Sequence, residues 1–418
     1  MLEDKLIRKE TVNARFAVIS DVHITQMKEG YELFDNTMRI MSKLKPDGYV
    51  FAGDIVYMIE KAGGGVCDKL YPVVYDYFGE IIEKYIGDTP FVYAIGNHEF
   101  PQHNMEKEIT CEARQLFVEK TGCLLREHKS ICGYHFITMD MENWQCVLSK
   151  ENEEWAKGEI ERAIEQSGNA PVFVVMHVPP HETVAGSDKT PVSISENFRN
   201  FLNSNQQIIC ITGHIHEPIQ DPRSIWQDKC TVIQAPVNAV GNLCVEIETK
   251  NVTVVPEKSY SQALLIDVFD DEVWIYGIDL IEEDIVNEPW IINTKDCSLH
   301  CYTNRRYECA SEPKFEAFNP QISYANGKLV VKLNHAVCED NGNGDTVLYY
   351  IVEIVDDFGN VRLTEKNISD FYCYEKKDFW EFEKEISLKG LNYIKIFPVS
   401  CFGKHGEMVE CSVCIDEN

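Results

Sequence analysis

The sequence predicts an α/β domain followed by a separate all-β sandwich. Short apolar runs alternate with longer amphipathic stretches through the first half of the chain, a pattern typical of strands that alternate with helices. From about residue 315 onward the pattern indicates only strands and turns. The chain has 418 residues, so each part is long enough to bury a core of its own.

Five apolar runs predict the first strands of the α/β domain. Each run is nearly continuous in apolar residues, which is typical of strands that are buried on both faces. The runs span residues 15–20, 48–52, 90–95, 171–176 and 207–212. The amphipathic stretches between them predict helices at residues 31–44, 68–85, 106–121 and 152–166. Buried strands separated by helices imply a sheet that helices cover on both sides.

A second sheet is predicted in the same domain. Residues 231–235, 262–269 and 273–279 have strand patterns, and the short polar segment 270–272 joins the last two as a hairpin. We assign these strands to the α/β domain, which then spans residues 1–290.

The C-terminal sandwich is expected over residues 315–418, after a connection at residues 291–314 that lacks periodicity. Roughly 100 residues is the size of a small β-sandwich. The strands expected in it are residues 328–333, 347–355, 361–364, 379–386 and 393–399, with a turn at residues 356–360.

The charge of the chain limits its partners. Lys and Arg number 39 and Asp and Glu number 68, which gives a formal net charge of −29. A surface this acidic repels a phosphate backbone at long range, so we expect no nucleic-acid polymer as a partner.

Cysteine usage and hydropathy indicate where the chain works. The 16 cysteines are scattered through a long sequence rather than concentrated in a small one, so we expect reduced thiols rather than a disulfide framework. No segment reaches about 18 consecutive apolar residues, and the N-terminal residues have no apolar stretch behind their charges. We therefore expect a cytoplasmic protein with no membrane association.

Side chains that can bind metals follow each of the five apolar runs. In open α/β sheets, ligands bind at the carboxyl ends of the strands, so these side chains are expected to converge although they lie far apart in sequence. The seven candidate donors are Asp21, His23, Asp54, Asn97, His177, His214 and His216, and His98 stands next to Asn97. No cysteine is among them, and nitrogen and oxygen donors suit Zn, Mn or Fe better than copper(I) or an iron–sulfur cluster.

Two metal ions account for the number of donors better than one. Seven candidate donors are too many for one four-coordinate ion, whereas two ions that share a bridging carboxylate use them all. Such a pair can hold a hydroxide at neutral pH and clamp the attacking and leaving oxygens of a displacement at phosphorus. Gly53, Gly96 and Gly213 stand where the chain must turn sharply off a strand, and they leave room for the backbone beside the metals.

The motif series resembles the calcineurin-like metallophosphoesterase superfamily. Asp-x-His, Gly-Asp, Gly-Asn-His-Glu, a single His after a strand, and Gly-His-x-His follow one another in that order over roughly residues 14–290. The resemblance implies a four-layer sandwich of two packed sheets flanked by helices. It implies one metal held by Asp21, His23, Asp54 and His216, and a second held by Asp54, Asn97, His177 and His214. His98 matches the histidine that contacts the phosphate and assists the leaving group, so His98 and Asp54 are the expected catalytic residues.

The resemblance also implies an activity. The expected reaction is hydrolysis of a small phosphomonoester or phosphodiester by a metal-bridging hydroxide, with Mn, Fe or Zn as the two ions. One alternative is a non-catalytic scaffold on the same fold, but such proteins normally lose ligands and none is missing here. The other is a nuclease, which the acidic charge argues against.

Three further side chains stand close to the predicted ligands. Tyr57 occupies a position where many relatives have Asp and where purple acid phosphatases have a tyrosine that binds iron. Those enzymes lack the histidine that is His23 here, so we expect Tyr57 to pack or hydrogen-bond beside the site, with iron ligation as the alternative. His103 and His181 follow ligand positions closely; either they line the substrate pocket or they are surface histidines.

The C-terminal region resembles fibronectin type III and related immunoglobulin-like sandwiches. Residues 388–393 are similar to a tyrosine corner that leads into a strand. Such a sandwich beside a hydrolase is either a packing or spacing module, which we favour, or a binding module for a partner or a glycan.

Overall fold

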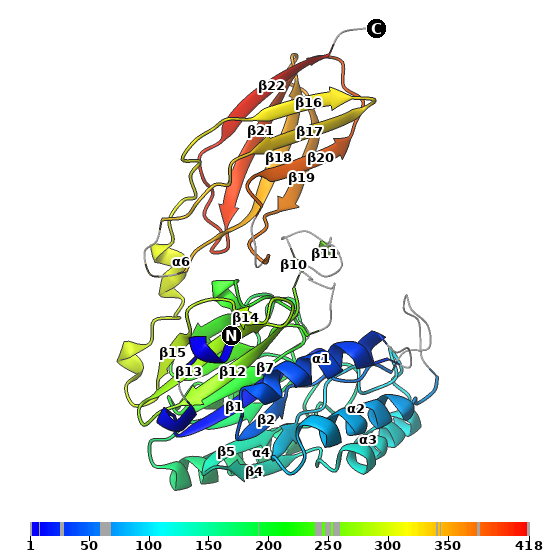
Figure 1. The fold of residues 1–418 in the computed structure, drawn as a ribbon, viewed down its shortest axis with the longest axis vertical. Helices are drawn as coiled ribbons and strands as arrows, with labels where there is room; N and C mark the ends of the chain where they lie inside the picture. Colours follow the sequence, from blue (N-terminus) through cyan, green and yellow to red (C-terminus); the bar gives the residue numbers. More distant parts are fainter. Residues whose placement is uncertain are drawn as a thin grey trace. The chain divides into compact units, whose positions relative to one another are not determined.

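The computed structural model describes most of the chain. The described residues are 2–7, 9–25, 29–58, 68–190, 192–238, 245–246, 252–253, 260–339, 342, 344–373 and 377–415. The chain divides into two compact units, each of which is described by itself (Figure 1). The first unit comprises residues 1–219, 223–245 and 254–303, and the second comprises residues 220–222, 246–253 and 304–418.

One sheet of the first unit has the strand order β14-β13-β12-β1-β2-β3, with β15 also paired to β13. The strands β1, β2 and β3 are parallel, and β12 runs antiparallel to β1. The bounds are β1 Ala14–Ile19, β2 Gly48–Phe51, β3 Phe91–Tyr93, β12 Gln262–Val268, β13 Glu272–Asp279, β14 Asp284–Ile285 and β15 Trp290–Asn293.

The other large sheet of this unit has the order β4-β5-β6-β7-β9-β8. The central strands β5, β6, β7 and β9 are parallel. The bounds are β4 Glu127–Ile131, β5 Tyr134–Thr138, β6 Val172–Val175, β7 Ile208–Thr212, β8 Ile225–Gln227 and β9 Thr231–Gln234. A separate pair of short strands, β10 Val245–Glu246 and β11 Val252–Thr253, forms its own ladder.

The two sheets of the first unit pack face to face. Phe16 of β1 contacts Phe136 of β5 edge-on with ring centroids 4.9 Å apart, and it also contacts Phe173 of β6 at 5.9 Å. Both rings belong to one buried apolar cluster contributed by the inner faces of both sheets. Burial of large aromatic side chains on both inner faces supplies the main stabilisation of such an interface.

Helices cover the outer face of each sheet (Figure 1). Phe34 of α1 and Phe78 of α2 pack on Phe51 of β2, and Phe117 of α3 packs on Tyr93 of β3. The helix α4 contacts β5 and β6 of the other sheet, and α5 contacts α4. The bounds are α1 Glu29–Lys43, α2 Val73–Tyr85, α3 Lys107–Thr121, α4 Lys150–Ser167 and α5 Glu196–Leu202, with short 3-10 turns η1 Leu2–Lys5, η2 Lys9–Thr11, η3 Pro222–Ser224 and η4 Cys297–Leu299. The predicted four-layer α/β class is confirmed.

The strands are shared between the sheets differently from the prediction. The five apolar runs do not form one sheet: β1, β2 and β3 lie in one, and β6 and β7 lie in the other. The predicted hairpin, β12 and β13, extends the sheet of β1 instead of forming a second sheet. Each sheet is therefore covered by helices on one face and by the other sheet on its second face. Continuous apolar runs report burial on both faces, whatever covers them.

The first unit extends further along the chain than predicted. Residues 290–293, at the boundary placed between the α/β domain and the connection, form β15 and pair with β13. The residues that follow remain with the first unit up to residue 303. Of the segment 291–314, only the part after residue 303, which contains the short helix α6 Arg305–Cys309, belongs to the second unit.

The second unit is a two-sheet β structure. One sheet has the order β16-β17-β20 and the other has the order β19-β18-β21-β22, and all their pairings are antiparallel. The bounds are β16 Gln321–Ala325, β17 Lys328–Leu333, β18 Val347–Asp356, β19 Val361–Ile368, β20 Trp380–Glu385, β21 Gly390–Ser400 and β22 Val409–Ile415. Tyr350 of β18 and Trp380 of β20 meet across the core with ring centroids 4.4 Å apart. The predicted all-β C-terminal part is thus confirmed.

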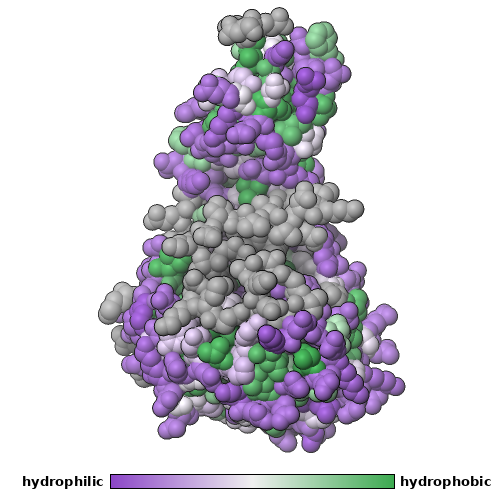
Figure 2. Space-filling view, turned by 90° about the vertical axis from the view of Figure 1, so that its right-hand side faces the viewer, coloured by the Kyte–Doolittle hydropathy of each residue, from purple (hydrophilic) through white to green (hydrophobic). Residues whose placement is uncertain are grey.

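The described surface is mostly hydrophilic on the face that Figure 2 shows. In Figure 2, hydrophilic side chains cover most of the described surface that faces the viewer, and the first unit shows one broader apolar area. Among the described residues, no helix combines the length and the apolar character needed to cross a membrane.

Candidate metal centre

The candidate metal centre lies at the carboxyl ends of strands from both sheets. Asp21 and His23 follow β1, Asp54 follows β2, and Asn97 and His98 follow β3. The other sheet contributes His177 after β6 and His214 and His216 after β7. Because these strands are parallel within each sheet, their ends meet at one edge of the domain.

One group of donors forms around Asp21. His216 Nε2 lies 3.0 Å from Asp21 Oδ1, and His23 Nε2 lies 3.9 Å from the same oxygen. The three side chains offer ligand atoms that all lie within 4.8 Å of one another, which is close enough to hold one metal ion. His23 Nε2 is also 3.6 Å from Asp54 Oδ2, so Asp54 adjoins this group.

A second group forms on the other side of Asp54. His177 Nε2 lies 3.0 Å from Asp54 Oδ2, and His214 joins them within the same 4.8 Å limit. The amide of Asn97 adds an oxygen, since Asn97 Oδ1 lies 2.9 Å from His214 Nδ1. Asp54 Oδ2 therefore faces donors of both groups.

The carboxylates of the centre are held in the charged form. Burial alone would raise the pKa of Asp54, but the neighbouring His177 and His98 keep it well below its usual value. Burial likewise opposes ionisation of Asp21, yet His216 lowers the pKa of Asp21 to about 2. Burial lowers the pKa of His177, but Asp54 more than offsets this and raises it to about 10. An ionised carboxylate is the form that binds a metal, whereas His177 must give up a proton to do so.

Two buried histidine nitrogen atoms indicate that metal ions fit the centre. His23 Nε2 and His177 Nε2 are both buried and make no hydrogen bond. The other ring nitrogen of His177, Nδ1, lies 2.8 Å from the carbonyl oxygen of Ala52 and donates to it. Nε2 is therefore the nitrogen that would offer a lone pair to a metal, once it has released its proton. Ser20 Oγ donates to Asp21 Oδ2 at 2.6 Å and orients that carboxylate. Orphaned nitrogens beside oriented carboxylates fit metal ions.

The backbone at the centre adopts conformations that are unfavourable elsewhere. Asp21, His23, Asp54, His214 and His216 all have positive φ, between 53° and 75°. Non-glycine residues in this region cost on the order of 1–3 kcal/mol each and concentrate at functional sites.

At each of the three motif glycines, a larger residue would clash with a neighbouring side chain. A Cβ at Gly96 would lie 2.4 Å from Asp54 Oδ1, and one at Gly53 would lie 2.4 Å from His177 Nδ1. A Cβ at Gly213 would lie 2.1 Å from Ser20 Oγ. Only glycine therefore lets these turns approach the donors.

A comparison with protein families places this arrangement. The family model for calcineurin-like phosphoesterases matches residues 14–218, which contain every donor described above. Residues 14–218 form a calcineurin-like phosphoesterase domain.

Solved structures resemble the calcineurin-like phosphoesterase fold of this chain at low sequence identity. A dimetal phosphatase from Danio rerio is 12% identical, with a TM-score of 0.43 over 68% of this chain and 100% of that chain. GAP50, described as the anchor in the inner membrane complex of Plasmodium, is 11% identical, with a TM-score of 0.37 over 68% and 89%. Vacuolar Protein Sorting 29 from Cryptosporidium parvum is 11% identical, with a TM-score of 0.35 over 67% and 98%. No curated protein matches the chain.

Glu99, the last residue of the Gly-Asn-His-Glu motif, supports the backbone of the candidate metal centre. Its buried carboxylate accepts hydrogen bonds from the backbone amides of Asp54 at 3.0 Å, Ile55 at 2.9 Å and Gly96 at 2.6 Å. The hydroxyl of Tyr93 donates to it at 2.7 Å. Glu99 thus fixes the turns that carry Asp54 and Asn97. The motif contains this residue, but nothing in the sequence showed that it binds backbone amides.

His98 lies beside Asp54 at the more open side of the centre. Its backbone amide donates to Asp54 Oδ1 at 2.7 Å, and its Nε2 lies 3.7 Å from Asp54 Oδ2. Its side chain is 16% exposed, whereas Asp54 and His177 are 1% and 0% exposed. Burial lowers the pKa of His98 to about 3, which keeps the imidazole neutral.

The three additional residues named from the sequence lie in different places. Tyr57 packs beside the centre, with its ring centroid 4.0 Å from that of His98 and 5.3 Å from that of His23. His103 is exposed and contacts Trp144 at 4.8 Å. His181 bonds through Nδ1 to the carbonyl oxygen of Ser187 in its own loop, at 2.9 Å. Trp144 was not predicted, because it stands in a loop without a motif.

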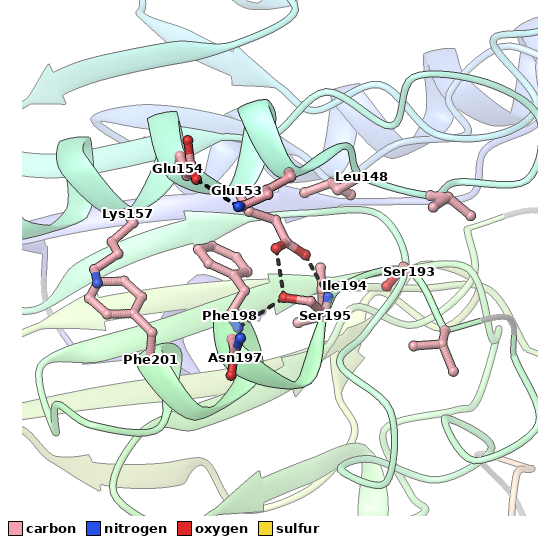
Figure 3. Close-up of a pocket in the computed structure, with 13 residues that line it drawn as sticks. Leu148, Glu153, Glu154, Lys157, Ser193, Ile194, Ser195, Asn197, Phe198 and Phe201 are labelled. Carbon is pink, nitrogen blue, oxygen red and sulfur yellow. Dashed lines mark hydrogen bonds and ion pairs between the residues drawn. The ribbon is translucent and has the colours of Figure 1, made fainter.

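A hollow of about 560 Å³ lies elsewhere on the domain, between α4 and α5 (Figure 3). Its wall contains Leu148, Ile194, Phe198 and Phe201, and Glu153 accepts hydrogen bonds from Ser195 beside it. The residues that line it include none of the metal donors.

Proposed function

We propose that the calcineurin-like phosphoesterase domain is a dinuclear metal-dependent phosphohydrolase that cleaves a small phosphomonoester or phosphodiester. The observation that carries this proposal is the position of Asp54, whose Oδ2 lies 3.6 Å from His23 Nε2 in one donor group and 3.0 Å from His177 Nε2 in the other. A single carboxylate between two groups is the arrangement that two neighbouring ions require.

The donors divide into two sets in this proposal. One ion would be held by Asp21, His23, Asp54 and His216, and the other by Asp54, Asn97, His177 and His214. Two such ions activate water at neutral pH and neutralise the charge that develops on a phosphoryl group. The donors are nitrogen and oxygen atoms, which supports Mn, Fe or Zn as the metals.

His98 serves the leaving group in this proposal. Its imidazole is neutral, partly exposed and 3.7 Å from Asp54 Oδ2 through Nε2. A neutral imidazole donates one hydrogen bond, and an ester oxygen held beside the donors lies within reach of it. His98 would therefore stabilise or protonate the oxygen on which charge develops.

Tyr57 supports the site by packing rather than as an iron ligand. Burial and the charge of Asp54 raise the pKa of its hydroxyl. Its ring lies against those of His98 and His23.

We infer that the second unit is a fibronectin type III-like sandwich. Its strands β16 to β22 form sheets of three and four, and β19 pairs with β18. In constant-type immunoglobulin domains the fourth strand instead joins the sheet of the first two, so the order here favours the fibronectin type. The turn before β21 is tied by Tyr324 of β16, which donates to Ile386 O at 3.0 Å and accepts from Leu388 N at 3.2 Å. Since all the metal donors lie in the first unit, a packing or spacing role fits this sandwich better than a catalytic one.

Metal analysis combined with turnover tests the proposed function. The purified chain, loaded with Mn, Zn or Fe, should carry two ions and hydrolyse 4-nitrophenyl phosphate or its diester. Asp54→Asn should lose both, because neither ion keeps its ligand set. Asp279→Asn is the matched control, because Asp279 is a buried carboxylate that only caps Ile281 and Glu282 amides at the end of β13. A wild-type chain without bound metal and without turnover would instead favour a scaffold.

A further inference from the structure

Aromatic side chains gather at the open side of the metal centre. Asp21, Asp54 and His177 are 0–1% exposed, whereas His23, His98 and His216 retain 10–16% exposure. Tyr57 and Trp144 are half-buried and His103 is exposed. We call Tyr57, His103 and Trp144 the aromatic rim. His98 keeps the largest exposed fraction of these six side chains, and Tyr57 and Trp144 of the rim lie against its ring.

Two residues of the rim, Tyr57 and Trp144, contact the ring of His98. The ring centroid of His98 lies 4.0 Å from that of Tyr57 and 4.9 Å from that of Trp144, and both contacts are edge-on. His103 adds a third ring, 4.8 Å from Trp144. Trp144 and His103 make these contacts with other rings. Neither residue belongs to one of the two donor groups.

The loop that carries Trp144 is fixed in place. It connects β5 to α4, and the Cys146 thiol approaches Asn97 Oδ1 at 3.9 Å. The amides of Cys146 and Gln145 donate to the backbone carbonyl and the side chain of Asn143, at 2.9 Å and 2.8 Å. A preorganised indole binds a ligand without first losing conformational entropy.

We propose that the aromatic rim binds a planar ring in the alcohol part of the substrate, so that the substrates are phosphate esters of phenols or of nucleosides. This inference rests on the proposed phosphohydrolase function. When the phosphoryl group lies at the buried donors, the group attached to its ester oxygen remains beside His98, where Trp144 stands. Indole and phenol rings stack on planar rings whatever their substituents. A short alkyl alcohol has no planar ring on which they could stack.

The test compares three esters on the full-length, metal-loaded chain: phenyl phosphate, adenosine 5′-monophosphate and glycerol 3-phosphate. Trp144→Ala should lower kcat/KM for at least one of the aromatic esters by roughly 10- to 100-fold relative to glycerol phosphate, the scale of one lost stacking contact. Trp144→Phe should restore most of the difference. Trp155→Ala is the matched control, because Trp155 is a half-buried indole on α4 that packs with Arg126 and should leave the ratio unchanged.

The pattern of losses decides the outcome. A selective loss on phenyl phosphate identifies an aryl ester, and a selective loss on the nucleotide identifies a nucleoside ester; both support the proposal. Equal losses on all three esters would mean that Trp144 only holds His98 in place, and would overturn it.

A binding measurement separates this proposal from the proposed function. Binding of phenyl phosphate, adenosine 5′-monophosphate and glycerol 3-phosphate is measured by isothermal titration calorimetry on the metal-free chain and on its Trp144→Ala variant. Wild-type protein that binds neither more tightly than glycerol phosphate overturns the rim proposal. Tight binding that is lost in Trp144→Ala supports the rim proposal even if no ester is hydrolysed. The absence of hydrolysis would then contradict only the proposed phosphohydrolase function.

Discussion

Glu99 accepts the backbone amide hydrogen of Asp54 at 3.0 Å, so a buried carboxylate that is no metal donor fixes the one that both donor groups share. The same carboxylate also receives hydrogen bonds from Ile55, Gly96 and Tyr93. The centre therefore depends on a carboxylate that belongs to neither donor group.

Glu99→Ala should destabilise the fold and release metal together. The substitution removes the acceptor of five donors: the backbone amides of Asp54, Ile55, Val56 and Gly96 and the hydroxyl of Tyr93. Each such group costs about 1–3 kcal/mol, so we expect a loss of about 5 kcal/mol or more in the free energy of unfolding. Glu99→Gln keeps one acceptor oxygen and should fall between wild type and alanine. Urea unfolding and metal content per chain measure both effects. Unchanged metal content in a folded Glu99→Ala chain would remove Glu99 from the support of the site.

Breaking the buried ion pair of Arg15 and Asp267 should destabilise the first unit far more than breaking an exposed pair. Arg15 Nε and Nη2 lie 2.6 Å and 2.7 Å from the two oxygens of Asp267, and the two side chains are 4% and 0% exposed. Asp267→Ala leaves a buried guanidinium unpaired, at a cost of about 3–5 kcal/mol. Asp76→Ala, which breaks the surface pair with Lys120, should cost about 0–1 kcal/mol. Equal midpoints of chemical unfolding for the two variants would contradict this ranking.

A chain that ends at Thr303 should fold, whereas one that ends at Ile219 should not. The family match ends at residue 218, but β12 pairs with residues 14–18 of β1 and buries Leu264 and Ile266 in the core between the sheets. Without β12, one edge of β1 has no paired strand and its backbone groups are exposed. Soluble yield and the cooperativity of thermal unfolding measure the difference. A cooperative transition in the shorter chain would show that the second half of the sheet is dispensable.

The side chains that the motifs predicted lie close together in the structure, and each follows a strand with a clear apolar run. Val172–Val175 and Ile208–Thr212 are examples, and His177 and His214 stand just beyond them. The partner of each strand could not be predicted, because a strand buried on both faces looks the same in either sheet. The strand Glu127–Ile131 was missed because four of its five side chains are polar, as on an edge. Trp144 was missed because a loop side chain is placed by tertiary contacts, which no local pattern encodes.

The Asp140 carboxyl should make the chain less stable as the pH rises from about 4 to about 6. Burial raises the pKa of Asp140 from 3.8 to about 6, although Arg114 opposes the shift. Between these values the folded state keeps a proton that the unfolded chain has released, so stability falls with rising pH. Asp140→Asn removes this step, and the difference in unfolding free energy between variant and wild type should change by on the order of 2–3 kcal/mol across the window. Urea unfolding at a series of pH values measures it, and a constant difference would mean that Asp140 titrates as in the unfolded chain.

His98→Asn should leave both metals bound and lower kcat. His98 Nε2 lies 3.7 Å from Asp54 Oδ2, and together with His23 and Asp54 it could also hold an ion, so the structure admits two roles. The donor sets proposed above are complete without it. We therefore expect a loss of roughly 10² to 10⁴ in kcat, the scale of a general acid or a hydrogen-bond donor to developing charge.

The leaving group distinguishes these two catalytic roles of His98. Nitrophenolate departs without a proton, so the loss should be smaller for 4-nitrophenyl phosphate than for an alkyl ester if His98 donates a proton. Equal losses on both esters would indicate charge stabilisation alone. His181→Asn makes the same change in a histidine that bonds to Ser187 O in its own loop, and it should lower kcat far less. A His98→Asn chain that binds fewer than two ions would make His98 a ligand, and the two donor sets would have to be redrawn around it.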